Sequence, residues 1–300
     1  MASVAKKEEI MVSPVQMNIL LRVNRYDCLT NEQVQDIFHW KSYRHAAERM
    51  QILSELGLLE RKKLPNEDLG GATWLYKIGE QGRTALRRND PLIDIPRFNM
   101  GADKLVISTQ WWHTVYATDV LIRAHLWQEE TEGFRIARME TERALQRRSA
   151  SFPKAPFAKS TTEKVIPDGF LEIHDLIKKD KYCFCLEVET GSHEMADIRD
   201  KVRNLVSFYD NGYERAFGVD FVVFLFIAMG IKKRSIPAEK HRTMMLTTIA
   251  ETLREIRRED MANSFYVTSG KPRDMALFTQ PIWYTPVVTN ESYEPHLLFA

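Results

Sequence analysis

Hydrophobic residues recur at helical spacing through the N-terminal part of the chain. Apolar positions three and four residues apart predict helices that begin near Pro14, after Thr30 and near Ser42. Thr30 is a typical helix N-cap residue, and Gln33 three residues later completes a capping box. Gly57 is predicted to end the third helix, because glycine commonly follows the last turn of a helix.

An extended segment follows the third helix and turns back on itself. Residues 60–63 read as a charged strand, residues 65–71 are rich in turn-forming residues, and residues 73–78 read as the returning strand. A further helix is predicted over residues 79–88. Three helices followed by a β-hairpin are typical of a winged helix, so residues 12–90 are predicted to form a winged helix-turn-helix domain that binds DNA.

The rest of the chain combines strands with helices. Helices are predicted over residues 109–130, 194–209 and 238–258. Strands are predicted over residues 165–173, 182–188, 221–229 and 264–267. The apolar run at 221–229 is continuous, which is typical of a strand that is buried on both faces. This order predicts a mixed α/β domain with helices on both faces of a sheet.

The length of the chain agrees with two domains. It has 300 residues, whereas a typical domain has about 100–150. Asn89, Asp90, Pro91 and Pro96 interrupt the helical pattern and predict a boundary there. The second domain is therefore expected over residues 105–285, and a C-terminal tail over residues 286–300.

The overall charge does not predict a nucleic-acid partner, but its distribution does. The chain has 42 Lys and Arg against 41 Asp and Glu, a formal net charge of +1. A basic surface must therefore be local. Residues 133–164 hold eight Lys or Arg against three Glu, and Arg147 and Arg148 in this stretch are predicted to bind DNA.

Cysteine content and hydropathy indicate a cytoplasmic protein without a membrane partner. Three cysteines are too few for a disulfide framework. The N-terminus lacks the apolar region of a signal peptide, and no apolar run approaches the roughly 20 residues that span a bilayer. Cys183 and Cys185, with His174 and His193, are a weak zinc pattern. Small hydrophobic residues packed against a helix are the preferred interpretation of these two cysteines.

Two carboxylates lie on the same face of the strand predicted at residues 182–188, one within the strand and one directly after its end. Glu187 and Glu189 point the same way, because strand side chains alternate. A hairpin centred between residues 177 and 178 places Asp168 opposite Glu187. Like charges on directly opposed residues of two paired strands are destabilising unless a cation neutralises them. We therefore predict a Mg²⁺ or Mn²⁺ site with Asp168 and Glu187 as ligands, which suits phosphodiester cleavage.

The helix predicted at residues 194–209 brings a positive charge to these carboxylates. Lys201 lies within the apolar stripe of this helix, whereas Asp200 faces away. A lysine in that position needs a carboxylate partner, and the nearest are Glu187 and Glu189. There Lys201 would stabilise developing charge or orient a water. Glu189 has two interpretations, a second metal ligand or a cap of the following helix.

These residues carry a resemblance to known proteins. Pro167-Asp168 and Glu187-Val188-Glu189 resemble the motifs of the PD-(D/E)xK nuclease superfamily. Over residues 12–230 the chain resembles the replication-relaxation family of plasmid and mobile-element proteins. That resemblance rests on the winged helix, Trp112-His113-Thr114, the segment from Glu140 to Leu145, Pro167-Asp168, the segment around Glu187, Lys201 and Tyr209.

The resemblance implies a restriction-endonuclease-like, PD-(D/E)xK mixed α/β fold for the second domain. The catalytic residues that it implies are Asp168, Glu187, Glu189, Lys201, His113 and Glu142. The chain departs from the superfamily at Glu189, where a lysine is expected, although some members carry that lysine on the following helix, as Lys201 would be. His113 has a second interpretation as a hydrogen-bonded core residue.

Three functions remain open from the sequence. The first is metal-dependent nicking or cleavage of DNA. The second is a catalytically inactive nuclease fold that acts as a replication accessory factor or transcriptional regulator. The third is a subunit that is active only with other proteins of a defence or transposition complex. The expected partner is double-stranded DNA, together with a second copy of the chain or other proteins of a mobile-element complex.

Basic and aromatic residues of the predicted winged helix are positioned for DNA. The start of the third helix carries Lys41, Tyr43, Arg44 and Arg49, and the wing carries Arg61, Lys62 and Lys63. The start of a recognition helix meets bases and phosphates, and a wing contacts the phosphate backbone. The alternatives are that these side chains only form a solvated face, or that the domain serves in dimerisation or protein docking.

Overall fold

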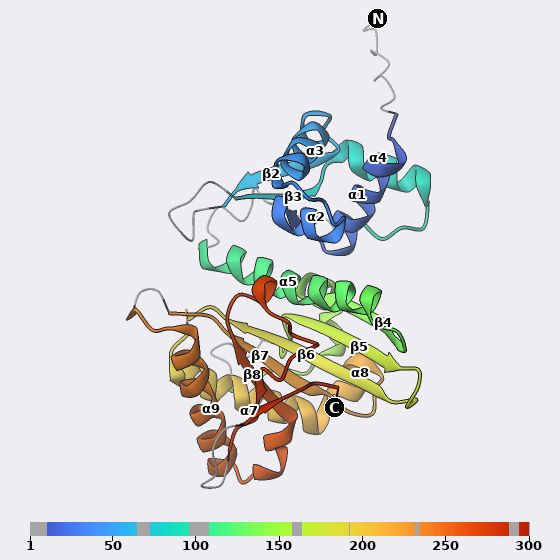
Figure 1. Ribbon diagram of the computed structural model, residues 1–300. Coiled ribbons are helices and arrows are strands. Elements are labelled where there is room, and N and C mark those ends of the chain that lie inside the picture. The colour runs from blue at the N-terminus through green and yellow to red at the C-terminus, as the bar shows by residue number, and fades with distance from the viewer. Residues whose placement is uncertain are drawn as a thin grey trace, which may run out of the picture. The chain divides into compact units, whose positions relative to one another are not determined.

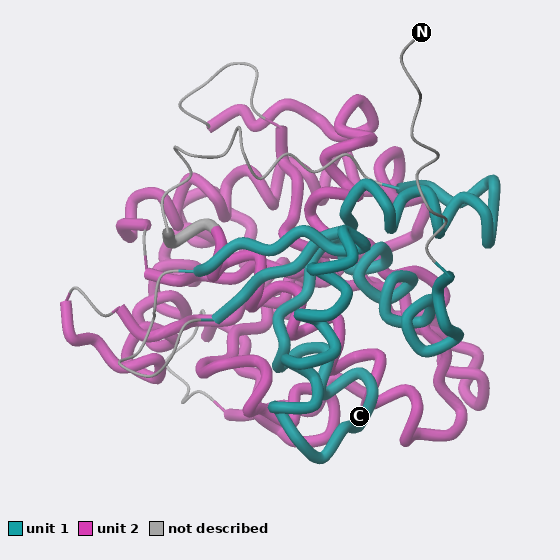
Figure 2. The backbone as a smooth tube through the Cα atoms, turned by 90° about the horizontal axis from the view of Figure 1, so that it is seen from above, with its two compact units in different colours: residues 1–108 teal, residues 109–300 magenta. Residues whose placement is uncertain are grey.

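The computed structural model describes residues 11–64, 73–95, 108–157, 164–191, 193–231, 234–287 and 294–299 (Figure 1). The chain divides into two compact units, residues 1–108 and 109–300 (Figure 2). The predicted turn at residues 65–71 and part of the predicted tail lie outside the described residues. None of the described helices combines the length and the apolar character needed to cross a membrane.

The first unit combines helices with a small antiparallel sheet. Its helices are α1 (Pro14–Arg25), α2 (Asn31–Ile37), α3 (Tyr43–Glu55) and α4 (Glu80–Asn89), and its strands are β1 (Leu29–Thr30), β2 (Leu59–Lys63) and β3 (Trp74–Ile78). The strands pair in the order β1-β3-β2. Helices therefore precede a hairpin of β2 and β3, in the order that the sequence predicts.

Local sequence signals explain where these helices begin and end. The Thr30 hydroxyl accepts a hydrogen bond from the Gln33 backbone N–H at 3.2 Å, and the Gln33 side chain accepts one from the Thr30 N–H at 2.9 Å. The predicted capping box is thus confirmed. Gly57 has a φ of +67°, which glycine adopts without steric cost, and it turns the chain from α3 into β2.

The second unit is a mixed α/β fold. Its helices are α5 (Ser108–Glu130), α6 (Glu142–Arg147), α7 (Met195–Asn211), α8 (Tyr213–Phe217) and α9 (Ala238–Glu255). Its strands are β4 (Phe134–Thr141), β5 (Gly169–Asp175), β6 (Lys181–Glu189), β7 (Val223–Ala228), β8 (Phe265–Ser269), β9 (Trp283–Tyr284) and β10 (Pro295–His296). The seven strands form one sheet in the order β10-β9-β8-β7-β6-β5-β4.

Strand direction changes across this sheet. The pairs β4–β5 and β5–β6 are antiparallel, β6–β7 and β7–β8 are parallel, and β8–β9 and β9–β10 are antiparallel. Helix α5 lies over one face, and α7 and α9 lie over the other (Figure 1). Strand β7 is buried along nearly its whole length, which agrees with its continuous apolar sequence.

The β5–β6 hairpin has the register that the sequence predicts. Ile173 pairs with Tyr182 and Gly169 pairs with Leu186, which places the centre between residues 177 and 178. The Asp175 side chain stabilises the turn by accepting hydrogen bonds from the backbone N–H groups of Ile177 and Lys178, both at 2.8 Å. Strand β5 begins at Gly169, so the predicted strand start at residue 165 is wrong.

Strand β4 has no counterpart in the sequence-based prediction. The register with β5 shifts between Ile136 and Arg138, which marks a β-bulge or similar irregularity. An irregularity of this kind breaks the alternation of inward and outward side chains, so the strand pattern is lost. Arg138 and Glu140 on this strand are only partly exposed, because they form an ion pair with each other at 2.8 Å.

The cysteines of β6 are part of the hydrophobic core. Cys183 and Cys185 are buried among residues of α7 and α9, including Val202 and Leu246. Burial raises the pKa of Cys183 to about 12 and the pKa of Cys185 well above its usual range. Among the residues that the structure describes, neither cysteine belongs to a group of side chains placed to hold a metal ion. The interpretation of both cysteines as small hydrophobic residues is confirmed.

Candidate functional site

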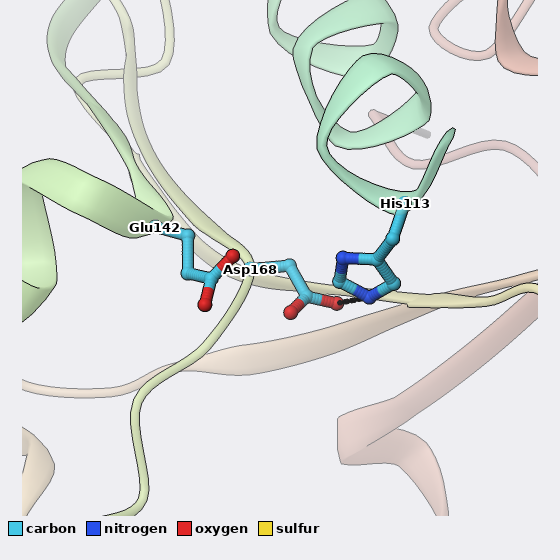
Figure 3. Close-up of side chains that lie close together, drawn as sticks. All are labelled: His113, Glu142 and Asp168. Carbon is cyan, nitrogen blue, oxygen red and sulfur yellow. Dashed lines mark ion pairs between the residues drawn. The ribbon is translucent and has the colours of Figure 1, made fainter. Parts of the chain in front are cut away.

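Three side chains from separate segments of the second unit meet at one point (Figure 3). His113 lies in the first turns of α5, Glu142 is the first residue of α6, and Asp168 directly precedes β5. One possible ligand atom of each lies within 4.8 Å of the others. His113 Nε2 is 3.0 Å from Asp168 Oδ2. These three residues are called the histidine–carboxylate group below.

Backbone hydrogen bonds hold the two carboxylates in place. Thr141 ends β4 and caps α6, because its hydroxyl accepts a hydrogen bond from the Ala144 N–H at 3.2 Å. The Glu142 N–H donates to the Asp168 carbonyl at 3.1 Å, and the Asp168 N–H donates to the Leu186 carbonyl at 2.9 Å. The start of α6, the start of β5 and strand β6 are therefore joined directly at the site.

The Asp168 carboxylate is buried but well satisfied. Its Oδ2 accepts a hydrogen bond from the Val188 backbone N–H at 2.7 Å in addition to its contact with His113. Burial favours the neutral acid, but the charge of His113, the hydrogen bond to it, Lys201 and the Val188 N–H together outweigh burial and lower the pKa of Asp168. Asp168 is therefore ionised at neutral pH.

The other two members of the group have raised pKa values. Burial opposes the charged form of His113, but the charge of Asp168 and the hydrogen bond to it outweigh burial and raise the pKa of His113 to about 9. Burial and the charge of Asp168 also raise the pKa of Glu142. The group thus holds a proton on His113 at neutral pH, which a metal ion bound to this imidazole would have to displace.

Lys201 lies beside the same group and joins two further carboxylates. Its Nζ is 2.9 Å from Glu187 Oε2 and also contacts Glu189 Oε1. Glu189 Oε2 is 2.9 Å from His193 Nδ1. Glu187 and Glu189 are only 4% and 1% exposed. The expectation that Lys201 pairs with both glutamates is confirmed.

One alternative raised by the sequence does not fit this geometry. The N-cap of α7 is Glu194, which forms a capping box with Asp197, so Glu189 does not cap the helix. Asp200, which is predicted to lie outside the apolar stripe of α7, is partly exposed and lines the same cavity as Asp168 and Glu187. The first turns of α7 therefore bring Asp197, Asp200 and Lys201 to the cavity.

The pKa values indicate more buried carboxylates than the nearby positive charges neutralise. Burial and the charge of Asp168 raise the pKa of Glu187 to about 8 despite the nearby Lys201. Burial opposes ionisation of Glu189, but Lys201 and His193 outweigh it and lower the pKa of Glu189 to about 2. Burial opposes the charge of Lys201, but Glu187 and Glu189 raise its pKa well above the usual range. Lys201 is therefore protonated, and an added cation would stabilise the ionised form of Glu187.

The residues that could hold a metal differ in part from the predicted pair. Asp168 belongs to the histidine–carboxylate group, whose nitrogen and oxygen donors are mutually close. Glu187 instead forms an ion pair with Lys201. Carboxylate oxygens and an imidazole nitrogen are ordinary ligands of divalent transition ions. His113 and Glu142 are expected at the site because of the family resemblance. The strand pattern does not indicate either of them.

A cavity of about 360 Å³ opens beside these residues. Asp168, Glu187 and Lys201 line one part of it, and Phe157, Asp200 and Asn204 line another. The sequence does not predict a role for Phe157 or Asn204. Asn204 follows Lys201 by three residues on α7, which is the spacing of one helix face, so helical periodicity alone could have identified it. No comparable signal marks Phe157.

The residues predicted to bind DNA in the first unit are mostly exposed. Lys41, Tyr43, Arg44 and Arg49 are exposed at the start of α3 or within it, and Arg61 and Lys63 are exposed on β2, where Lys62 is half-buried. Arg44 pairs with Glu48 at 2.7 Å. The Arg61 guanidinium lies 4.6 Å from the Trp74 ring centroid. These positions leave DNA binding by the first unit as a prediction.

The two arginines predicted to bind DNA in the second unit differ. Arg147 is exposed. Arg148 instead donates to both carboxylate oxygens of Glu140 at 2.9 Å, contacts the Ala216 carbonyl, and lies over the Phe217 ring. These internal contacts use three of the five N–H donors of the guanidinium. Arg148 therefore contributes to packing within the second unit, and its contact with DNA stays a prediction.

Comparison with known proteins gives one family. A family model described as replication-relaxation matches residues 20–219, which is more than half of the chain. No curated protein and no solved structure gives a significant match. The matched segment includes the histidine–carboxylate group, Glu187, Glu189 and Lys201.

Proposed function

Because the chain belongs to the replication-relaxation family, which connects it with the replication of plasmids or mobile elements, we propose that it is a metal-dependent endonuclease that nicks or cleaves DNA. One observation carries this proposal. Potential ligand atoms of His113, Glu142 and Asp168 lie within 4.8 Å of one another, close enough for one ion to contact all three, beside a cavity that Asp168, Glu187 and Lys201 line. Carboxylates and a lysine around one cavity are the groups that metal-assisted phosphodiester hydrolysis needs.

The two units would have separate roles in this proposal. The first unit would act as a winged helix that binds duplex DNA through α3 and the hairpin of β2 and β3. The second unit would act as a PD-(D/E)xK nuclease domain. Its order of an antiparallel hairpin, a helix and a parallel strand, formed by β5, β6, α7 and β7, supports this assignment.

The residues present fit a divalent ion. His113, Glu142 and Asp168 would hold it, and the surplus of carboxylates described above would be neutralised by its charge. When bound, such an ion lowers the pKa of a water and stabilises negative charge on phosphate oxygens. The imidazole of His113 departs from the all-oxygen set that Mg²⁺ prefers, so Mn²⁺ fits this donor set better.

The protein residues have separate roles in this proposal. Lys201 remains protonated and is held between Glu187 and Glu189, so its ammonium can stabilise the charge that develops on a phosphate oxygen. Burial raises the pKa of Glu187 to about 8 in the metal-free protein, so Glu187 is then mostly protonated at neutral pH. With a cation nearby to favour its ionised form, Glu187 would be suited to accept a proton from an attacking water. Glu189 and His193 contact each other, and Glu189 would position Lys201.

The alternative function is a nuclease fold without catalytic activity, which binds DNA as a replication accessory factor or regulator. The observation that favours it is Glu189, which occupies the position of the superfamily lysine. The contacts of Lys201 with Glu187 and Glu189 favour the active enzyme, because they hold an ammonium group from α7 near the position of the superfamily lysine.

Incubation with supercoiled plasmid in Mn²⁺ or Mg²⁺ tests the proposal. We expect the wild-type protein to produce open-circular DNA and Asp168→Ala to lose at least about 100-fold in rate, because the variant lacks a metal ligand and the carboxylate that pairs with His113. Glu251→Ala, which removes an exposed carboxylate paired with Arg199, is the control and should nick at the wild-type rate. DNA binding without nicking by the wild-type protein would support the inactive alternative.

A further inference from the structure

The cavity beside the proposed metal ligands has a second wall that the proposed chemistry does not use. This wall contains Phe157, Asp200 and Asn204. Asp200 and Asn204 lie four residues apart on α7, so both side chains project from one face of the helix. Lys201, next to Asp200, connects this wall with Glu187. A ligand held here would therefore lie directly beside the catalytic groups.

Phe157 presents an aromatic ring to solvent at the cavity. Its side chain is 47% exposed. Its backbone N–H donates to Asn204 Oδ1 at 2.9 Å, and the Arg203 guanidinium lies 5.8 Å from the ring centroid, so α7 holds both the backbone and the ring. An exposed and positioned aromatic ring is a platform on which a nucleic-acid base can stack, and such stacking tolerates every base.

Polar groups on the same wall have unused hydrogen-bonding capacity. Asn204 uses its oxygen for Phe157, and its side-chain NH₂ has no hydrogen-bond partner among the residues that the structure describes. Asp200 Oδ1 accepts from Arg203 at 2.9 Å, while Oδ2 has no partner in that same part of the chain. A carboxylate only accepts hydrogen bonds at neutral pH, so Asp200 suits a ligand with N–H donors.

We propose that this cavity binds one unpaired base of a DNA strand, adjacent to the phosphate that reaches Asp168 and Glu187. The inference rests on the proposed function, because it assigns a substrate feature to the same site. A volume of about 360 Å³ is within the range of pockets that enclose small ligands, roughly 300–1,000 Å³. A base that is stacked in a duplex cannot enter such a cavity, so it must be extruded or single-stranded.

The charge of the wall decides which part of the nucleotide it contacts. Asp197 and Asp200 both line the cavity, and their carboxylates repel phosphate. They attract the exocyclic amino group of cytosine, adenine or guanine, whereas thymine has carbonyl oxygens and no amino group. The subsite should therefore prefer a base with an amino group over thymine.

Binding measured without cleavage tests the inference. The probe is a fluorescein-labelled single-stranded oligonucleotide with one abasic position moved along its length, titrated with the full chain in Ca²⁺ and followed by anisotropy. We expect one position at which loss of the base weakens binding about tenfold, the range of one base–aromatic stack. Phe157→Ala should bind every abasic oligonucleotide equally. Ile177→Ala removes an exposed apolar side chain from the β5–β6 turn and should retain the wild-type profile.

A matched pair of bases tests the role of Asp200. At the sensitive position, cytosine should bind several-fold more tightly than thymine, and Asp200→Asn should remove that difference. Circular dichroism melting confirms that each variant folds. A flat abasic profile for the wild type, or an unchanged profile for Phe157→Ala, would overturn the inference even if the protein nicks plasmid. A sensitive position in a protein that never nicks would support the subsite and overturn the endonuclease proposal.

Discussion

The ammonium group of Lys201 contacts the carboxylate of Glu189, the residue at the position where the resemblance to PD-(D/E)xK nucleases leads us to expect a lysine. The same ammonium lies 2.9 Å from Glu187. Lys201 on helix α7 thus places a positive charge beside the negatively charged Glu189 of β6. This relationship makes an exchange of the two residues informative.

Exchanging the charges should preserve the pair. Glu189→Lys alone places two ammonium groups together, and Lys201→Glu alone adds a carboxylate beside two buried ones. Breaking a buried ion pair costs about 3–5 kcal/mol, so each single variant should lose roughly that much free energy of unfolding. The double variant Glu189→Lys with Lys201→Glu should be more stable than either single variant in urea denaturation. Additive losses would show that the two side chains are not coupled.

The contact between His113 and Asp168 predicts that stability falls at alkaline pH. The pKa of His113 is raised in the folded protein from 6.5 to about 9, so its contribution is complete below pH 6.5 and is lost as the pH rises through 9. We expect the metal-free protein in EDTA to lose on the order of 3 kcal/mol of unfolding free energy over this interval. His113→Asn should show a smaller loss, and the remainder should come from Glu187, whose pKa is raised to about 8 in the folded protein. The control His174→Asn, on the partly exposed pair with Glu172, should retain the full loss.

The histidine–carboxylate group predicts a preference among metals. Mn²⁺ should bind more tightly than Mg²⁺, because His113 supplies a nitrogen ligand. Electron paramagnetic resonance of Mn²⁺ titrations should show at least tenfold weaker binding for His113→Asn and for Glu142→Gln. Affinity for Mn²⁺ should increase with pH, since the imidazole must lose its proton. Equal affinity of His113→Asn and wild type would exclude His113 from the ligand set.

Arg148 and its neighbour Arg147 should respond differently to truncation. Arg148→Ala leaves Glu140 without one of its partners and removes a contact to the Ala216 carbonyl. We expect a loss of about 2–4 kcal/mol of unfolding free energy. Arg147→Ala, at an exposed position, should change stability by less than about 0.5 kcal/mol. Thermal denaturation of both variants compares them directly.

The exposed cations of α3 predict a salt-dependent interaction with DNA. Each lysine or arginine that contacts a phosphate adds about 0.9 to the slope of log affinity against log salt. Arg49→Ala and Lys41→Ala should each reduce the slope by about that amount with a duplex of any sequence. Arg25→Ala, on the exposed end of α1, is the control. An unchanged slope for both α3 variants would argue against this helix as the DNA-contacting element.

Local signals in the sequence determined much of the fold. The capping box of Thr30 and Gln33 and the left-handed Gly57 need only neighbouring residues, so their outcome follows from short-range chemistry. The turn around Asp175 determined the register of β5 and β6, because one pairing of a hairpin determines all the others. The position of Lys201 in the apolar stripe of α7 likewise indicated its carboxylate partners.

Tertiary structure alone decided how the site is assembled. His113 meets Asp168 from a distant helix, and Glu142 reaches them because the irregular strand β4 ends beside β5. The sequence shows that Arg148 is basic, but it does not show whether the side chain faces DNA or Glu140. Packing of the folded chain places it against Glu140. Periodicity reports which face a side chain occupies within its own element. The distance between elements depends on how their faces pack, and for this reason the metal-ligand geometry and the cavity beside it emerged only from the folded chain.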